Sequence, residues 1–489
     1  PSPAPPPRVG PELHLDPVAG EGRAEGVMRG VREAIADGRL PSGTRLPSSR
    51  ALAADLGVAR NTVVRAYEEL TAEGWLVARR GSGTTVASRG DPSRESPTSR
   101  RTGHPSRCGR VVPVPRYDLR QGSPAADSFP RGAWLTSTRR ALLTAPDDAF
   151  GPGDPRGHPA LRREVALYLA RARGVRTDPE RVVICAGVSH ALRLLASLRR
   201  GAVAVEEYGP VFQYRILEEA GLRAVPLPVD ADGARVGALT DSPAGTPGTR
   251  EVRTVLLTPA HQFPLGGPLA AERRAAVIEW ARERDGLVLE DDYDGEFRYD
   301  RRPVGALQAL DPERVVHLGS VSKSLSPALR LGWMVLPGHL VPRVLALKGE
   351  REARTSVPDQ LTLADFLASG ARDRHVRRMR ERYRRRRDRL HRALAERVPG
   401  VGVCGAAAGL HAVVTLPPET DEAAVVAAAA RRGVAVEGLA DYRWRAPAGV
   451  GEDQCPKGLV VGYGAPSESA FPNALEALCG VLREALAHR

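Results

Sequence analysis

Lysine is almost absent from this chain. Only Lys323, Lys348 and Lys457 stand among the 71 lysines and arginines of its 489 residues. Arginine stays protonated in a protein, whereas a lysine amine can lose its proton and act as a nucleophile. Lys323, which lies in the stretch SVSKSLSPALR, is therefore the first candidate for chemistry that needs an amine.

Cysteine and long apolar runs are also scarce. The five cysteines are scattered, without a CxxC pair or a cluster with histidine, which argues against a disulfide framework and a zinc site, so no metal is expected. No apolar run is long enough to cross a membrane. The first residues, PSPAPPPRVG, lack the apolar core of a signal peptide. Together these absences predict a cytoplasmic protein.

The balance of charge is strongly basic, with a formal net charge of +13 and a pI of about 10.0. Such a balance favours an anionic partner, usually nucleic acid. An arginine-rich composition with its charge spread over solvated faces explains the same numbers, so charge alone leaves both interpretations open.

Composition divides the chain into four regions. Residues 1–22 form a proline-rich tail, residues 23–88 carry short helical patterns, and residues 89–116 have the Ser, Pro, Gly and Arg content of a flexible linker. From 117 to 489, apolar runs such as RVVICAG and GLVLEDDY alternate with helix-like stretches such as AERRAAVIEWARER. This alternation predicts an α/β domain with a largely parallel sheet.

The segment LPSSRALAADLGVARNTVVRAYEEL predicts a helix-turn-helix. Ser48 can cap a first helix that runs through Ala54, and a second helix begins near Ala59 and runs to about Glu73. The following WLVARR and GTTVA predict a hairpin, or wing. A small helical domain with ordinary surface arginines is the alternative.

The second helix of such a motif points its N-terminus into the major groove of DNA. There, Arg suits guanine edges and Asn suits adenine edges, and arginines on the wing can meet phosphates. The candidate DNA-binding residues from this reasoning are Arg60, Asn61, Thr62, Arg65, Arg79 and Arg80.

Residues 23–88 closely resemble the winged helix-turn-helix head of GntR-type transcriptional regulators, through LPSSR, LGV, RNTV and the later AY and L positions. The resemblance implies that the head binds double-stranded DNA. It also implies contacts from Arg50 and from the wing glycines Gly81 and Gly83.

A pyridoxal phosphate site needs a lysine that forms an imine and a carboxylate beside the ring nitrogen. It also needs hydroxyls, an arginine and a helix N-terminus around the phosphate. The stretch LVLEDDYDGEFRY supplies acids after a buried strand, and Lys323 supplies the amine. The candidate phosphate ligands are Ser320, Ser322, Arg330, Gly187, Val188 and Ser189.

Each of these motifs alone has an ordinary interpretation as a surface lysine, a helix cap or metal site, or a strand-to-helix connector. Their set, with GPGDPRGHPALRREVALYLARARGV and TPAHQFPLGG, resembles the fold-type I aminotransferase-like domain. Joined to a GntR-type head, it resembles MocR-type regulators. The resemblance implies that Lys323 is the imine-forming catalytic lysine, that Asp291 pairs with the ring nitrogen, and that Tyr293 lies near the ring hydroxyl. It leaves open whether His261 or Gln262 is the second polar partner there.

The chain departs from the family's usual text in two places. Where the family has a tyrosine in text like VEDPGYPG, this chain reads VEEYGPVF and has Pro210, with Tyr208 or Phe212 as replacements. Where aminotransferases have an arginine that grips a substrate carboxylate, this chain reads LVVGYG and has Val460. Arg443, Arg445 and Lys457 are the substitutes for that arginine.

The run RDRHVRRMRERYRRRRDRLHRAL, residues 372–394, predicts a basic amphipathic helix. Its apolar positions, Val376, Met379, Tyr383 and Leu390, form the expected buried stripe. We expect its arginines to form a solvated face, with a second DNA contact as the alternative.

The sequence therefore predicts a transcription factor whose body senses an amino compound or pyridoxal phosphate itself. The resemblance implies a head-to-tail homodimer. The rival hypothesis is an active aminotransferase with an accessory DNA-binding head, and a third is a body without cofactor that serves only for dimerisation.

Overall fold

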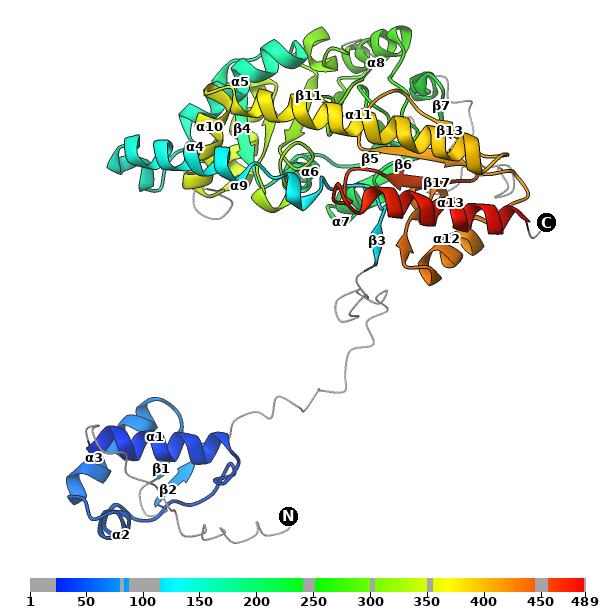
Figure 1. Ribbon diagram of the computed structural model, residues 1–489. Coiled ribbons are helices and arrows are strands. Elements are labelled where there is room, and N and C mark those ends of the chain that lie inside the picture. Colours follow the sequence, from blue (N-terminus) through cyan, green and yellow to red (C-terminus); the bar gives the residue numbers. More distant parts are fainter. Residues whose placement is uncertain are drawn as a thin grey trace. The chain divides into compact units, whose positions relative to one another are not determined.

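The computed structural model describes residues 23–79, 83–87, 115–240, 251–299, 304–349, 355–444 and 456–487. The chain divides into two compact units between Val111 and Val112, a head and a body, shown in Figure 1. Among the predicted site residues, Arg80, Gly81 and Arg445 lie outside the described ranges. Every helix within those ranges is too short or too polar to cross a lipid bilayer.

The head consists of three helices and a two-stranded sheet: α1 (Arg23–Ala36), α2 (Ser49–Asp55), α3 (Arg60–Ala72), β1 (Leu76–Arg79) and β2 (Gly83–Val86). The Ser48 hydroxyl caps α2 by accepting a hydrogen bond from Ala51 N at 3.2 Å. Gly57 turns the chain between α2 and α3 with a φ of +64°, a region that favours glycine. Because β1 and β2 pair antiparallel, the structure confirms the predicted helix-turn-helix and wing.

The core of the head is apolar and closed. Val31, Leu52, Val63 and Leu70 are fully buried, and they come from all three helices. The Tyr67 hydroxyl on α3 donates to the Pro47 carbonyl at 3.0 Å, just before α2. These contacts fix α3 against α2 and leave its other face to the solvent.

The body contains a seven-stranded central sheet. Its strands, in spatial order, are β4 (Val182–Cys185), β12 (Gly332–Val335), β11 (Val315–Ser320), β10 (Leu287–Asp291), β9 (Val252–Leu257), β5 (Ala202–Glu206) and β6 (Arg223–Leu227). Strand β12 runs antiparallel to both neighbours, and all other pairs are parallel. The predicted α/β domain with a largely parallel sheet is confirmed.

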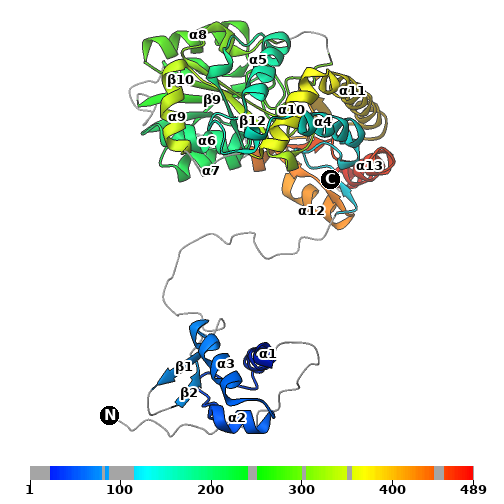
Figure 2. The ribbon, with the colours of Figure 1, turned by 90° about the vertical axis from the view of Figure 1, so that its left-hand side faces the viewer.

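Helices cover both faces of this sheet, because successive strand residues point to opposite faces and both sets are apolar. One face packs against α6 (Val188–Ser197), α7 (Val211–Glu219) and α9 (Val341–Lys348). The other packs against α5 (Pro159–Arg173), α8 (Ala271–Glu283) and α10 (Val357–Ala368). Figure 2 shows α5 and α8 on one side of the strands and α6 and α7 on the other.

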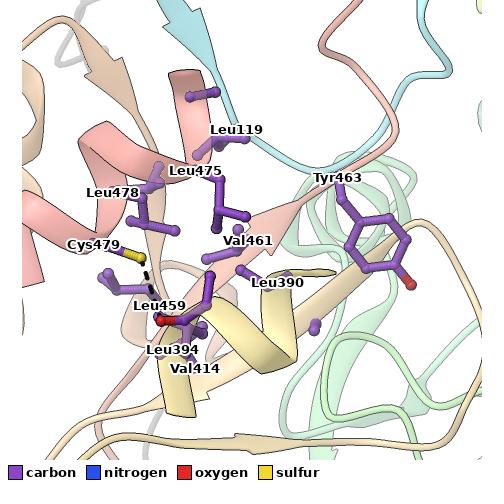
Figure 3. Close-up of a cluster of buried hydrophobic side chains, with 14 of the residues drawn as sticks. Leu119, Leu390, Leu394, Val414, Leu459, Val461, Tyr463, Leu475, Leu478 and Cys479 are labelled. Atoms are coloured by element: carbon purple, nitrogen blue, oxygen red, sulfur yellow. Dashed lines mark hydrogen bonds between the residues drawn. The ribbon is translucent and has the colours of Figure 1, made fainter. Parts of the chain in front are cut away.

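The rest of the body forms a smaller α/β layer. Its antiparallel sheet contains β13 (Gly402–Cys404), β14 (His411–Thr415), β17 (Gly458–Gly462) and β16 (Glu437–Gly438). It packs against α11 (Ala371–Arg397), α12 (Glu422–Arg431) and α13 (Phe471–Ala487). In Figure 3, Leu390 and Leu394 of α11 face Leu475 and Leu478 of α13 across Val461 of the sheet.

The remaining helices and strands described are short or peripheral. Helix α4 (Arg131–Thr144) packs on α10. Two pairs of short strands complete the body: β3 (Tyr117–Asp118) with β15 (Val434–Ala435), and β7 (Val229–Asp230) with β8 (Gly233–Ala234). Strand β3 brings the first described residues of the body to the smaller layer. The segment that follows it continues toward the candidate site.

The long helix α11 confirms its predicted apolar stripe, since Val376, Met379, Tyr383 and Leu390 are buried. The prediction that its arginines form a solvated face is wrong for Arg372 and Arg386, which are 1% and 3% exposed. Arg372 pairs with Glu296 and stacks on the Tyr168 ring at 4.0 Å, and Arg386 donates to Glu468 at 2.9 Å. These built-in partners compensate the charge that burial would otherwise leave unsolvated.

Candidate functional site

One edge of the central sheet gathers the ends of three strands that carry predicted site residues. Strands β10 and β11 are parallel, so Asp291 and Ser320 leave the sheet at the same edge. Strand β12 is antiparallel to β11 and to β4, and its first residue, Gly332, pairs with both Ser320 and Cys185. The turn after β4, which contains Gly187, therefore lies at this edge too, where ligands of α/β sheets bind.

Lys323 follows β11 in a tight turn and is half-buried. Its Nζ donates to the carbonyl of Gly122, 201 residues earlier in the chain. Burial lowers the pKa of Lys323, while the carboxylates of Asp294 and Asp291 oppose that shift. A lower pKa favours the neutral amine, which is the form that attacks an aldehyde carbon.

Asp291 lies at the end of β10 and is 2% exposed. Its Oδ2 accepts a hydrogen bond from Gln213 Nε2 at 2.8 Å, and its Oδ1 has no partner. Burial raises the pKa of Asp291 to about 6, the Gln213 bond opposes the shift, and the neighbouring Asp292 adds to it. A buried acceptor without a partner costs about 1–3 kcal/mol, so this carboxylate fits a ligand that brings a proton donor.

The protonated ring nitrogen of pyridoxal phosphate is such a donor. The fold thus places an amine and an unsatisfied carboxylate oxygen at one sheet edge, which is the pair of groups that this cofactor needs. The residues present fit the cofactor.

Tyr293 belongs to a buried group of hydrogen-bonded side chains. Its hydroxyl oxygen lies 2.8 Å from His261 Nδ1, which also lies 2.9 Å from Asp294 Oδ2. The rings of Tyr293 and His261 stack with their centroids 5.9 Å apart. Asp294, His261 and the Tyr293 hydroxyl therefore meet at one ring nitrogen and hold one another in place.

Gln262 has a different role. Its Nε2 donates to the carbonyls of Tyr208 and Phe263 at 2.7 Å each, and its Oε1 accepts from Leu265 N at 3.1 Å. Both ends of the amide are engaged with the backbone. Between the two residues that the sequence left open, only His261 contacts Tyr293.

The predicted phosphate ligands lie around the start of α6. Gly187 is its N-cap, with a φ of +87°, and Val188 and Ser189 are its first residues. The Arg330 guanidinium packs over Gly187, since a Cβ there would lie 3.5 Å from Arg330 Nη1, and it donates to the Ala186 carbonyl at 2.5 Å. The Ser320 hydroxyl accepts from Ser322 N at 3.3 Å. A helix N-terminus with free N–H groups beside an arginine is a general anion-binding arrangement.

The position expected to grip a carboxylate lies among apolar side chains. Val460 on β17 is fully buried in a group that we call the apolar cluster: Tyr208, Phe263, Val413, Leu439, Tyr442 and Val460. Tyr293 packs against this cluster, so the cluster adjoins the candidate cofactor site. A carboxylate placed among these side chains would lose its hydration, and the Arg443 guanidinium beside Tyr208 already pairs with Glu207.

The proposed substitutes for the missing arginine and tyrosine fall in different places. Arg443 pairs with Glu207 at 2.8 Å, and the guanidinium lies 5.9 Å from the Tyr208 ring centroid. Tyr208 is buried in the apolar cluster, whereas Phe212 is 56% exposed. Pro210 is the N-cap of α7. Lys457 precedes β17 and is partly exposed.

Sequence reasoning missed several residues of this region. Gln213 on α7 and Gly122 near β3 contact Asp291 and Lys323 from distant parts of the chain, and no local pattern indicates them. Asp294 follows Tyr293 in EDDYDG, where its acidity was visible but its partner was not. His411 also lies here: its ring is 5.6 Å from that of His261, and burial lowers its pKa to about 3.

In the head, the predicted DNA-binding face is open to solvent. Arg50 on α2 and Arg60, Asn61 and Arg65 on α3 are exposed, and Thr62 is half-buried. Arg65 makes an ion pair with Glu69 at 2.9 Å, which raises its pKa. Arg79 ends β1, and Gly83 begins β2 with a φ of +82°.

Sequence reasoning did not single out Arg45 on the wing side of the head. A Cβ on Gly83 would lie 3.0 Å from Arg45 Nε. Arg45 is exposed and bridges to Thr85 of β2. It therefore adds a cation beside the wing.

Comparison with known proteins agrees with this architecture. Residues 23–86 match the family of bacterial regulatory proteins called gntR, and residues 119–445 match aminotransferase class I and II. The probable rhizopine catabolism regulatory protein MocR of Rhizobium meliloti is 36% identical over 374 residues, which cover 73% of this chain and 74% of that protein. The chain belongs to the MocR-type regulators of the GntR family.

Other relatives of this MocR-type regulator support the assignment. The HTH-type pyridoxine biosynthesis transcriptional regulator PdxR of Corynebacterium glutamicum is 34% identical over 443 residues, or 90% of this chain and 92% of that protein. Among solved structures, the kynurenine aminotransferase of Pyrococcus horikoshii is 25% identical, with a TM-score of 0.67 over 76% of this chain and 91% of that chain. The body thus has the fold-type I aminotransferase fold.

Proposed function

We propose that this MocR-type regulator holds pyridoxal phosphate on Lys323 and couples the state of that site to operator binding by its head. The observation that carries the proposal is the buried Asp291, whose Oδ1 lacks a partner at the sheet edge where Lys323 lies. The cofactor supplies an aldehyde that condenses with amines and a ring that accepts electrons when its nitrogen is protonated.

The residues around the ring then have separate roles. Lys323 provides the amine, and Asp291 keeps the ring nitrogen protonated by accepting its hydrogen bond. Tyr293, held by His261 beside Asp294, would contact the ring hydroxyl. The phosphate is held by the N-terminus of α6 and nearby side chains: Gly187, Val188, Ser189, Ser320, Ser322 and Arg330.

The effector is an amino compound or pyridoxal phosphate itself. The apolar surroundings of Val460 argue against a simple amino acid, because its carboxylate needs a cation. Arg443, a candidate substitute from the sequence, is paired with Glu207. The Corynebacterium relative is named a regulator of pyridoxine biosynthesis, which supports the same class of small molecule. We therefore favour pyridoxal phosphate as effector.

The head binds double-stranded DNA through the exposed start of α3, and a homodimer places two heads on two half-sites. The surface of the body supports a second copy. Leu135 and Leu143 of α4 are 68% and 76% exposed, and Phe150 nearby is 52% exposed. Large apolar side chains that face water together favour a protein interface. A head-to-tail arrangement follows the family resemblance.

The first experiment tests the amine. Lys323→Ala is incubated with pyridoxal phosphate, reduced with borohydride and measured by mass spectrometry. We expect the parent to gain one covalent label and the variant to gain none, while Lys457→Ala, an equally simple loss of a lysine, keeps the label. A labelled Lys323→Ala protein would overturn the assignment.

The rival hypothesis of an active aminotransferase draws on the same amine and carboxylate. A turnover assay separates the two, because a regulator needs only to bind its ligand, whereas an enzyme must also position a substrate for proton transfer.

A further inference from the structure

Five exposed arginines form a straight row along α11. They are Arg374, Arg378, Arg385, Arg389 and Arg392, and we call them the arginine row. Their spacings of 4, 7, 4 and 3 residues keep them in one narrow sector of an α-helix. At a rise of about 1.5 Å per residue, the row is about 27 Å long. The helix runs along the surface of the body (Figure 1, yellow).

Several other charges of α11 already have partners. Arg372 and Arg386 are built into the core contacts described above, and Arg382 pairs with Glu468 at 2.8 Å. The acids Asp373, Glu381 and Asp388 lie within ion-pair distance of Arg171, Arg384 and Arg387, respectively. By contrast, no member of the arginine row makes an ion pair with another residue of the described chain; Arg374 donates only to the Ser369 carbonyl, at 3.1 Å.

The length and straightness of the arginine row indicate which kind of anion it binds. Duplex DNA carries about one phosphate charge per 1.7 Å of axis, so a cationic row about 27 Å long matches a linear polyanion better than a small anion. Guanidinium groups also present a planar fork that fits phosphate oxygens. A lipid surface fits poorly, because a membrane-binding helix must offer its apolar face, and the apolar face of α11 is buried. A second copy of the same face would repel this one.

We propose that the arginine row binds phosphates of duplex DNA that extends beyond the sequence read by the head. The inference rests on the proposed function, since it needs a head that binds DNA. Residues 89–116 tether the head to the body, so a duplex held by one unit is at high effective concentration for the other. Phosphate contacts add affinity and fix the path of the duplex, but they read no sequence.

The test replaces Arg378, Arg385 and Arg389 together by Gln in the full-length protein. Glutamine keeps the helix propensity and removes three charges. Binding to a mixed-sequence duplex of about 60 base pairs is measured by fluorescence anisotropy at several salt concentrations. We expect the slope of log affinity against log salt to become shallower by about 2–3 units, since each phosphate contact contributes about 0.9. Affinity at low salt should fall at least roughly tenfold.

Two control variants distinguish phosphate contacts along α11 from a general effect of net charge. Arg200, Arg215 and Arg284, also exposed but on other elements, are replaced together by Gln, so the net charge changes equally. This control should keep the slope of the parent, and Lys at the three α11 positions should restore it. Equal flattening in both Gln variants, or no change in the α11 variant, would overturn the arginine row as a DNA contact.

A third variant distinguishes failure of the row from failure of the head. Arg60→Ala is titrated with a duplex selected by the parent from a random pool. One outcome is that Arg60→Ala loses its preference for that duplex while the α11 variant binds like the parent. In that case only the proposal that the arginine row binds DNA is wrong, and an acidic protein becomes the better candidate partner for the row. If the parent binds no duplex at all, the proposed function and the arginine row both fall.

Discussion

The two ends of the candidate site in the body have opposite chemistry. The ring end, made of Asp291, Lys323, Tyr293 and His261, is dense in hydrogen-bonding groups and has one unsatisfied acceptor. The apolar cluster around Val460 adjoins Tyr293, and the arginine beside it, Arg443, already pairs with Glu207. In the proposed function, this body keeps the groups that hold a cofactor and has Val460 in place of the arginine that grips a substrate carboxylate. The proposal therefore expects cofactor binding without efficient turnover.

The largest expected effect comes from restoring the missing cation. Val460→Arg places a guanidinium in the fully buried apolar cluster, where the cross-strand neighbour Glu437 already accepts from Tyr442, and a buried charge without a full set of partners costs about 3–5 kcal/mol. We expect urea unfolding to show a loss of that order, while Leu310→Arg, at a position that is 50% exposed, changes little. A stable Val460→Arg protein that gains affinity for amino acids would instead show an open carboxylate site and break the comparison.

The second largest expected effect concerns cofactor affinity at the ring end of the site. Asp291→Asn removes the charge that faces the ring nitrogen, and a hydrogen bond to a charged group contributes about 1.5–3 kcal/mol. Titration of cofactor-free protein with pyridoxal phosphate should therefore show roughly 10- to 100-fold weaker binding. Asp365→Asn, which alters an ion pair with Arg140 on the outer helices, serves as the control. Unchanged affinity in Asp291→Asn would remove the ring nitrogen as its partner.

The smallest effect is a pH dependence. The folded pKa of Asp291, about 6, lies above that of an unfolded aspartate, because burial favours the neutral acid. The folded state therefore binds the extra proton, and its stability falls as the pH rises through about 6. Between pH 5 and 7.5, the cofactor-free parent should lose on the order of 1 kcal/mol more unfolding free energy than Asp291→Asn. Parallel curves for the two proteins would contradict this pKa.

Local patterns were sufficient to predict much of the fold. The caps, glycine turns and periodicities that define the helix-turn-helix act over a few residues, so Ser48 and the bounds of α3 follow from the sequence. Strands such as β4 and β10 follow from short apolar runs in the same way. The apolar stripe of α11 was equally visible.

Contacts between distant segments were not predictable. Gln213 binds Asp291 across 78 residues, and Gly122 meets Lys323 across 201 residues, so only the folded chain identifies them. The burial of Arg372 depends on Tyr168 and Glu296, which lie on other elements. The choice between His261 and Gln262 likewise needed the positions of their hydrogen-bond partners.

The most direct test of the central claim is a turnover assay on the cofactor-loaded protein. Amino acids, ω-amino acids and other amines are supplied with a keto acid, and product is followed over many protein equivalents. We expect the protein to bind pyridoxal phosphate but to show no sustained turnover, because the apolar cluster cannot hold a carboxylate for proton transfer. Turnover at ordinary enzyme rates, about 1 per second or faster, would contradict it.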